Sequence, residues 1–210
     1  MVLRTGATDA NNNATTYDYD AAGRLVKESD PLGNVITYTY DARGSFSSRA
    51  VANGARTNYT YDSIGRLLRK TFPDGSATEF TYDAKGNILT ASNQHISYNF
   101  NHDALGRITN VGDSNAKVIS YQYDAIGKRT KAIYPEGAAI TYTYDSANRL
   151  SSIVNNNETY SYQYDTLGRR VKLSLPNGAG ADYAYDALGR LMSLTHKTSS
   201  GAVIDSFDYT

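Results

Sequence analysis

The feature that most constrains this chain is a motif that returns every 20 or 21 residues. It reads YTYDSIGRL over residues 59–67, and one Asp marks each copy. The nine marking residues are Asp20, Asp41, Asp62, Asp83, Asp103, Asp124, Asp145, Asp165 and Asp186, and a tenth copy begins at Phe207. A fixed period of this length predicts a repeat architecture, in which each unit is stabilised mainly by its neighbours.

The four residues that start at each Asp predict a tight reversal of the chain. Asp suits the first position of a type I turn, and the fourth position needs a positive φ in a three-residue hairpin loop closed by a bulge. The residues at this fourth position are Gly23, Gly44, Gly65, Gly86, Gly106, Gly127, Asn148, Gly168 and Gly189. Because Asn tolerates the left-handed region best after Gly, the position requires a backbone angle and not a chemical group.

Aromatic residues precede each Asp in an alternating pattern, which places them on one face of a strand. The tyrosines of this pattern are Tyr17, Tyr19, Tyr38, Tyr40, Tyr59, Tyr61, Tyr82, Tyr121, Tyr123, Tyr142, Tyr144, Tyr162, Tyr164, Tyr183 and Tyr185, with Phe80, Phe100 and His102 at equivalent positions. Thr, Ser and Gln alternate with them, so one face packs and the other meets water. We expect the rings of neighbouring hairpins to stack, and the Tyr hydroxyls to stay hydrated and be dispensable.

The returning strand after each turn begins with an apolar residue in seven of nine copies, and the exceptions are Arg129 and Arg170. Its later residues do not alternate cleanly, so we expect bulges or partial burial of both faces there. A second reversal follows, rich in Gly, Pro and Asn, and its varied residues predict turn types that differ between repeats. Two strands and two turns fill the period and leave no room for a helix. The sequence therefore predicts an all-β fold of tandem antiparallel β-hairpins.

The repeat pattern also predicts the domain boundaries. Residues 1–14 lack alternation, and we expect a poorly ordered lead or the remnant of a preceding repeat there. Residues 15–210 are expected to form one array of nine repeats and a truncated tenth. An array that stops leaves unpaired strand edges, so we expect either capping by residues 1–14 and 193–210 or edge-to-edge self-association.

Composition excludes several classes of function. The chain has 21 Lys and Arg and 21 Asp and Glu, and this balance argues against nucleic-acid binding, which needs a basic face. No apolar run is long enough to span a membrane, and Met1–Gly6 lacks the apolar core of a secretory signal. The absence of Cys leaves the redox compartment open.

The charged residues that recur at fixed positions of the repeat predict a structural role and not catalysis. Equivalent turn carboxylates do not provide two groups with separated pKa values, and Asp-x-x-Gly lacks the ligand spacing of a calcium loop, so each Asp is expected to accept N–H groups of its own turn. An Arg four residues after six of the Asp residues predicts a partly exposed ion pair across the turn, and a ligand-binding row of Arg is the less favoured alternative. His95, His102 and His196 show no metal-ligand spacing. We therefore expect no catalytic residues, no metal and no cofactor.

The motif Tyr-x-Tyr-Asp-x-x-Gly-Arg-Leu, with Asp-Pro-Leu-Gly-Asn at residues 30–34 as its spacer, closely resembles the Rhs/YD-repeat family. That family includes Rhs polymorphic toxins, the B and C components of insecticidal toxin complexes, and teneurins. The resemblance implies a spiralling, shell-like sheet that encloses a C-terminal toxin or effector, and a bacterial protein that is secreted or displayed at the cell surface. The Asp-Pro-x-Gly element resembles a sequence near the cleavage site of such proteins, but here it sits at a spacer turn. The lack of an effector segment predicts a repeat fragment or a short relative.

The expected function is a non-enzymatic, structural one: part of the β-shell of an Rhs-type protein, with the rest of the shell and the enclosed toxin or effector as partners. The alternative is a carbohydrate-binding adhesion module at the cell surface, in which exposed Tyr rings act as platforms for sugars. A glycoside hydrolase is the least favoured hypothesis, because no repeat carries an unusual pair of acids.

Overall fold

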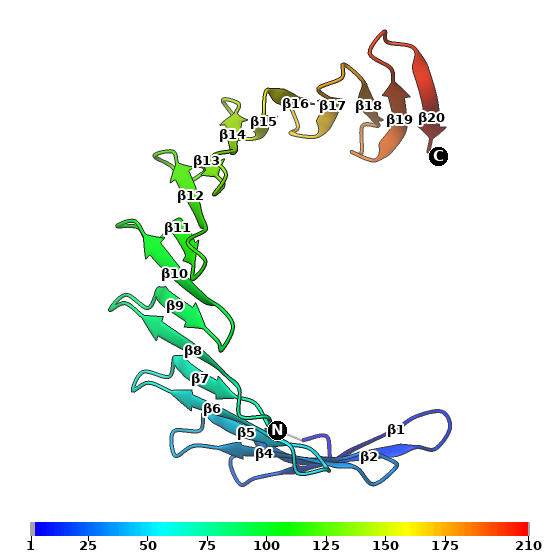
Figure 1. The fold of residues 1–210 in the computed structure, drawn as a ribbon. Helices are drawn as coiled ribbons and strands as arrows, with labels where there is room; N and C mark the ends of the chain where they lie inside the picture. Colours follow the sequence, from blue (N-terminus) through cyan, green and yellow to red (C-terminus); the bar gives the residue numbers. More distant parts are fainter. Residues whose placement is uncertain (1–2, 210) are drawn as a thin grey trace. The chain divides into compact units, whose positions relative to one another are not determined.

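The computed structural model describes residues 3–209, and every element within them is a β-strand (Figure 1). The chain divides into two units. The N-terminal unit comprises Met1–Arg107 and Gly112–Ala116, and the C-terminal unit comprises Ile108–Val111 and Lys117–Thr210. The division runs through strand β11, which spans Ile108–Asp113.

In the N-terminal unit each strand pairs antiparallel with the next one in sequence, from β1 to β10. Its strands are β1 (Gly6–Thr8), β2 (Ala14–Tyr19), β3 (Leu25–Ser29), β4 (Val35–Tyr40), β5 (Phe46–Ala50), β6 (Arg56–Tyr61), β7 (Leu67–Thr71), β8 (Ala77–Tyr82), β9 (Ile88–Ser92) and β10 (Ser97–His102). Gly6–Thr8, ahead of the first full repeat, adds a strand to this sheet.

The C-terminal unit repeats this arrangement from β12 to β20. Its strands are β12 (Val118–Tyr123), β13 (Arg129–Ile133), β14 (Ala139–Tyr144), β15 (Leu150–Asn155), β16 (Glu158–Tyr164), β17 (Arg170–Ser174), β18 (Gly180–Tyr185), β19 (Leu191–Lys197) and β20 (Val203–Asp208). The predicted all-β fold of tandem antiparallel hairpins is confirmed in both units.

The expected bulge lies at the same place in each hairpin that is closed by the Asp turn and whose register is defined. In the hairpin of β6 and β7, Tyr59 pairs with Lys70 and Tyr61 pairs with Leu67, so Leu68 is an extra residue. Seven other hairpins shift register at the equivalent position. The bulge explains why the returning strands do not alternate cleanly: it turns the first residue back to the face that carries the tyrosines. We call this face of each unit the tyrosine face.

The second reversals are more uniform than the sequence predicted. In the spacer at Asp30, Gly33 donates to the Asp30 carbonyl oxygen at 3.0 Å and Asp30 donates to the Asn34 carbonyl oxygen at 3.0 Å, which is the hydrogen-bond pattern of the first reversal. The same pattern closes the turns over residues 51–55, 72–76, 134–138, 175–179 and 198–202. The expectation of varied turns was wrong for these, because a Gly at the fourth position suffices whatever precedes it. The expectation of a different turn type is confirmed between residues 155 and 158, where a two-residue loop has Asn156 and Asn157 both at positive φ.

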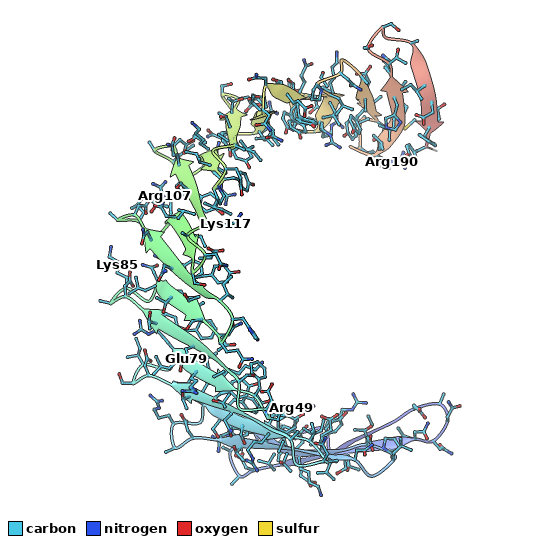
Figure 2. The ribbon with its side chains drawn as sticks, in the orientation of Figure 1. Arg49, Glu79, Lys85, Arg107, Lys117 and Arg190 are labelled. Atoms are coloured by element: carbon cyan, nitrogen blue, oxygen red, sulfur yellow. The ribbon has the colours of Figure 1, made fainter. Side chains whose placement is uncertain are left out.

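Neither unit has a conventional interior. Side chains project from both faces of a single layer of strands (Figure 2). Within residues 3–209, the buried residues are Ala50, Ala132, Ala181 and Ser48. The face opposite the tyrosine face is polar, as predicted: Thr81 and Thr90 share a hydrogen bond of 2.6 Å, and Arg69 pairs with Glu79 at 3.0 Å. Stability must therefore come from contacts between adjacent strands.

Candidate functional site

The repeated hairpin tip is held by the side chain of its Asp. Oδ1 of Asp62 accepts the N–H groups of Ile64 and Arg66 at 3.0 and 2.9 Å. Gly65 has a φ of +88° and donates to the Asp62 carbonyl oxygen. The predicted turn is confirmed, and so is the positive φ at every Gly of this position and at Asn148, whose φ is +66°.

These hydrogen bonds favour the ionised form of the carboxyl groups. The N–H of Arg66, followed by the Arg66 side chain, lowers the pKa of Asp62 below its usual value. The N–H group four residues ahead is likewise the main cause of the lowered pKa at Asp20, Asp41 and Asp145. At Asp103 and Asp165 burial raises the pKa, but the turn hydrogen bonds outweigh it and the pKa is lowered. These groups are charged structural acceptors at neutral pH, and none is tuned for proton transfer.

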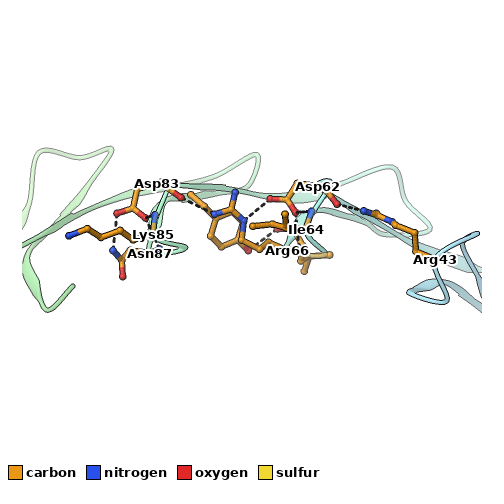
Figure 3. Close-up of polar contacts among 9 residues, drawn as sticks. Arg43, Asp62, Ile64, Arg66, Asp83, Lys85 and Asn87 are labelled. Carbon is orange, nitrogen blue, oxygen red and sulfur yellow. Dashed lines mark hydrogen bonds and ion pairs between the residues drawn. The ribbon is translucent and has the colours of Figure 1, made fainter. Parts of the chain in front are cut away.

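The Arg that follows the turn at Asp62 does more than pair with its own Asp. Nε of Arg66 donates to Oδ2 of Asp62 at 2.6 Å, and its Nη1 donates to the main-chain oxygen of Asp83, in the next hairpin, at 2.8 Å (Figure 3). The guanidinium carbon also lies 4.7 Å from the centre of the Tyr82 ring. One side chain therefore joins two successive hairpins by an ion pair, a hydrogen bond and a cation–π contact.

Among the described residues, a cation contacts the following hairpin at every step between two complete hairpins of a unit, through a Tyr ring, a main-chain oxygen or both. Arg24, Lys128, Arg149 and Arg169 lie over Tyr40, Tyr144, Tyr164 and Tyr185. Two copies carry Ser45 or Asn87 in place of the cation. In these copies the tip residue substitutes: Arg43 donates to the Asp62 carbonyl oxygen at 2.6 Å and Lys85 to that of Ala104 at 2.9 Å.

The second Tyr of each pattern provides another link. The hydroxyl of Tyr40 donates to the carbonyl oxygen of Leu25, the first residue of the preceding returning strand, at 2.8 Å. The equivalent hydrogen bonds come from Tyr19, Tyr61, Tyr82, Tyr123, Tyr144, Tyr164 and Tyr185. The expectation that these hydroxyls stay hydrated was wrong, since each donates to a main-chain oxygen of the segment that precedes its hairpin.

The expected stack of tyrosine rings is also absent from most of the described sheet. Phe46 contacts Tyr38, Tyr40 and Tyr59 with ring centres 5.0–6.0 Å apart. Elsewhere a returning strand separates the tyrosines of successive hairpins by two strand spacings, about 10 Å, which is too far for ring contact. Cations and aliphatic side chains occupy the space between the rings.

No metal site forms among the described residues, where no group of three or more His, Cys, Asp or Glu residues converges. His196 pairs with Asp205 across β19 and β20. His102 replaces the second Tyr of its repeat, and its Nδ1 is buried without a hydrogen-bond partner among the described residues. The described part of the chain also includes no helix that is long and apolar enough to cross a bilayer.

Comparison with known proteins identifies the hairpin array. The family model described as Teneurin YD-shell matches residues 3–132. The chain belongs to the YD-shell family. The RHS Repeat model matches residues 144–179 of the same YD-shell array. A search of curated proteins gave no match.

Several solved structures with the same fold come from Tc toxin complexes. A crystal structure of TcdB2-TccC3-Cdc42 aligns with a TM-score of 0.66 at 16% identity. The alignment covers 94% of this chain and 14% of the chain in that structure. The Tc holotoxin pore of Photorhabdus luminescens aligns with a TM-score of 0.63 at 15% identity, over 94% of this chain and 13% of its own. The YD-shell array thus spans about one seventh of the length of the first of these proteins, and the likeness establishes the fold.

Proposed function

We propose that this chain is one section of the wall of a larger protein shell, and that the shell encloses a toxin or effector polypeptide. The observation that carries the proposal is a YD-shell array with no interior of its own whose fold matches a section of a toxin complex. The partners are then the remaining sections of the shell and the enclosed polypeptide. A secreted or cell-surface protein of a bacterium fits this role.

The physical basis is the way in which one hairpin adds to the next. Each addition pairs two strand edges, places a cation over a Tyr ring and gives a Tyr hydroxyl a main-chain acceptor. Because all of these contacts are between neighbours, a wall of this kind extends in one direction without a core that must close around itself. A single layer with two solvated faces can separate an inside from an outside.

The carbohydrate-binding alternative is less well supported by the geometry. A sugar would need an open Tyr face, and guanidinium groups cover the rings of Tyr40, Tyr82, Tyr164 and Tyr185 at 4.5–4.7 Å. The hydroxyls of these rings are also engaged with main-chain oxygens. A role in structure explains both contacts, whereas a role in sugar binding explains neither.

Limited proteolysis of the full-length product of the gene that contains this array tests the proposal. We expect a polypeptide outside the array to survive a broad-specificity protease while the array is intact. It should become degradable in an Arg66→Ala, Arg169→Ala variant, whose links between hairpins are removed, but not in Arg190→Ala. Equal degradation of all segments outside the array in the unaltered protein would overturn the proposal.

A further inference from the structure

Two arginines break the repeat pattern in the C-terminal unit. Arg129 and Arg170 occupy the first position of their returning strands, where the other copies have Leu, Ile or Phe. Arg129 pairs with Tyr123 and Arg170 with Tyr164 in the strand register, so both side chains emerge on the tyrosine face. A charged residue at a position that otherwise holds a packing residue needs a specific reason.

Neither guanidinium has an acidic partner among the described residues. Arg129 lies 4.5 Å from the centre of the Tyr121 ring, and Arg170 lies 4.5 Å from that of Tyr183. Both arginines are exposed, and the ion pairs of this unit use other cations. Arg149 and Arg169, by contrast, are bound to the Asp residues of their own turns. The two exceptional arginines therefore present free charge to solvent, with the ring beneath each fixing its position.

The surface beside Arg129 is hollowed and largely apolar. A hollow of about 460 Å³ is lined by Arg129, Gly127, Leu150 and the rings of Tyr123, Tyr142 and Tyr144. Leu150 occupies the same position as Arg129 in the next hairpin, and lies between the two arginines. The face therefore alternates cation, apolar residue, cation across the strands. Such a surface suits a ligand with carboxylates separated by apolar groups.

The spacing of the two arginines selects the kind of ligand. Their strands, β13 and β17, are four strand spacings apart, or about 19 Å. The two guanidinium groups lean away from each other, over Tyr121 in β12 and Tyr183 in β18, which are six strand spacings or about 29 Å apart. An extended polypeptide covers about 3.3 Å per residue, so the separation of the two charges corresponds to about six to nine residues. We propose that the tyrosine face of the C-terminal unit binds an acidic polypeptide segment that crosses the strands and places two carboxylates, about six to nine residues apart, on Arg129 and Arg170.

Other anions fit the surface less well. A small carboxylate reaches one guanidinium and not both. Nucleic acid gains its affinity from many phosphate contacts, whereas this face has two arginines without acidic partners among the described residues, and the chain as a whole has no net charge. An acidic polysaccharide would supply carboxylates but no apolar side chains for the hollow beside Leu150.

The proposal deepens the proposed function, because it rests on that function for the origin of the segment: in the larger protein, the acidic segment would belong to the enclosed polypeptide. The acidic-polypeptide site and the enclosure of a polypeptide can be disproved independently of each other. Binding of an acidic peptide is measured on this chain alone, whereas enclosure is measured by protease protection of the full-length protein.

A fluorescent peptide of twelve residues, with Glu at its second, eighth and eleventh positions and Leu and Ser between them, is a suitable probe, because it offers pairs of Glu six and nine residues apart. We expect saturable binding to the chain, and a loss of affinity of about tenfold or more in the Arg129→Leu, Arg170→Leu variant, because two charge-assisted contacts are removed. The variant should fold, since Leu is the natural residue at this position in four other hairpins. A melting temperature equal to that of the unaltered chain would show that the variant folds.

The controls separate this site from general electrostatic attraction. Lys131 and Lys172 lie on the same two strands with side chains on the opposite face, so Lys131→Gln, Lys172→Gln removes equal charge away from the site. We expect less than about a twofold change for this variant and no binding of the peptide with Gln in place of Glu. The proposal is overturned by equal losses in the Arg and Lys variants, by unchanged affinity in the Arg variant, or by binding of polygalacturonate but not of the peptide.

Discussion

At the scale of single residues, the hairpin tip separates what the backbone demands from what the side chain supplies. Gly65 has a φ of +88°, and a Cβ added there would meet no atom within 4 Å. Any cost of a substitution at Gly65 is therefore backbone strain and not a clash. Asp62, beside it, contributes two hydrogen bonds to the same tip through its side chain.

We predict that Gly65→Val lowers the free energy of unfolding by more than about 1 kcal/mol, because a β-branched residue is strained at positive φ. Gly65→Asn should cost clearly less, as Asn148 holds the equivalent position at +66°. Urea denaturation of both variants measures the difference. Equal midpoints would contradict the requirement for positive φ.

His102 provides a test in which a substitution is expected to stabilise the protein. Its ring lacks the hydroxyl that links equivalent tyrosines to the preceding hairpin, and its Nδ1 is buried and unpaired among the described residues. A hollow of about 450 Å³ lies beside the ring, between Leu89 and Phe100. We predict that His102→Tyr raises the free energy of unfolding by about 1 kcal/mol, since it adds a hydrogen bond to a main-chain oxygen and removes an unsatisfied nitrogen.

Thermal denaturation of His102→Tyr, with the reverse change Tyr82→His as its control, measures this effect. Tyr82→His should be destabilising, because the hydrogen bond from Tyr82 to the Leu67 carbonyl oxygen is lost. A lower melting temperature for His102→Tyr would show that the hydroxyl link does not form in that repeat.

At the scale of the hairpin, the links between neighbours hold the sheet together. Arg66 and Arg190 make the same ion pair within their own turns, at 2.6 and 2.7 Å. Of these two, only Arg66 reaches a following Tyr ring and carbonyl oxygen, and its side chain is 27% exposed against 72% for Arg190. The two arginines thus differ in their contacts to the next hairpin and not in their local pair.

We predict that Arg66→Ala destabilises the protein by about 1 kcal/mol more than Arg190→Ala does, because it also removes a cation–π contact and a hydrogen bond to a main-chain oxygen. Urea denaturation compares the two variants, and hydrogen exchange over β6 to β9 locates the effect. Equal destabilisation would mean that the contacts between hairpins contribute nothing beyond the ion pair.

Sequence predicted the hairpin well and the contacts between hairpins poorly. Alternation and turn residues are local signals, so the strands, the bulged turns and the carboxylate acceptors follow from them. The partner of Arg66 in the next hairpin is 17 residues away, and neither propensity nor periodicity reports such a contact. One signal was nevertheless present: the copies with Ser45 and Asn87 in place of the cation are the ones with Arg43 and Lys85 at the tip. This exchange within the repeats indicates a shared contact.

At the scale of the whole molecule, one carboxylate per repeat makes the array sensitive to acid. The pKa is lowered at Asp20, Asp41, Asp62 and Asp145 by N–H groups of their own turns. A carboxyl group whose pKa is lower in the folded state stabilises that state above its unfolded pKa, about 3.9, and the stabilisation is lost as the pH falls through the folded pKa.

We therefore predict a melting temperature that varies little from pH 8 to 5 and falls steeply below about pH 4. Circular dichroism against temperature and pH measures it. Asp62→Asn should flatten the acid limb slightly, since one of several equivalent groups is removed. A melting temperature that rises on acidification below pH 4 would contradict the role of these carboxylates.

The links that end on main-chain oxygens have a further consequence. Tyr40 requires a carbonyl group at Leu25, and Arg66 requires one at Asp83, but neither depends on the side chain that the partner residue carries. A hairpin copied or exchanged by recombination would thus meet acceptors already in place beside it, without compensating substitutions in either neighbour. Arrays of this kind can change length and diverge in composition, as long as each new unit keeps its hydroxyl, its cation and its turn.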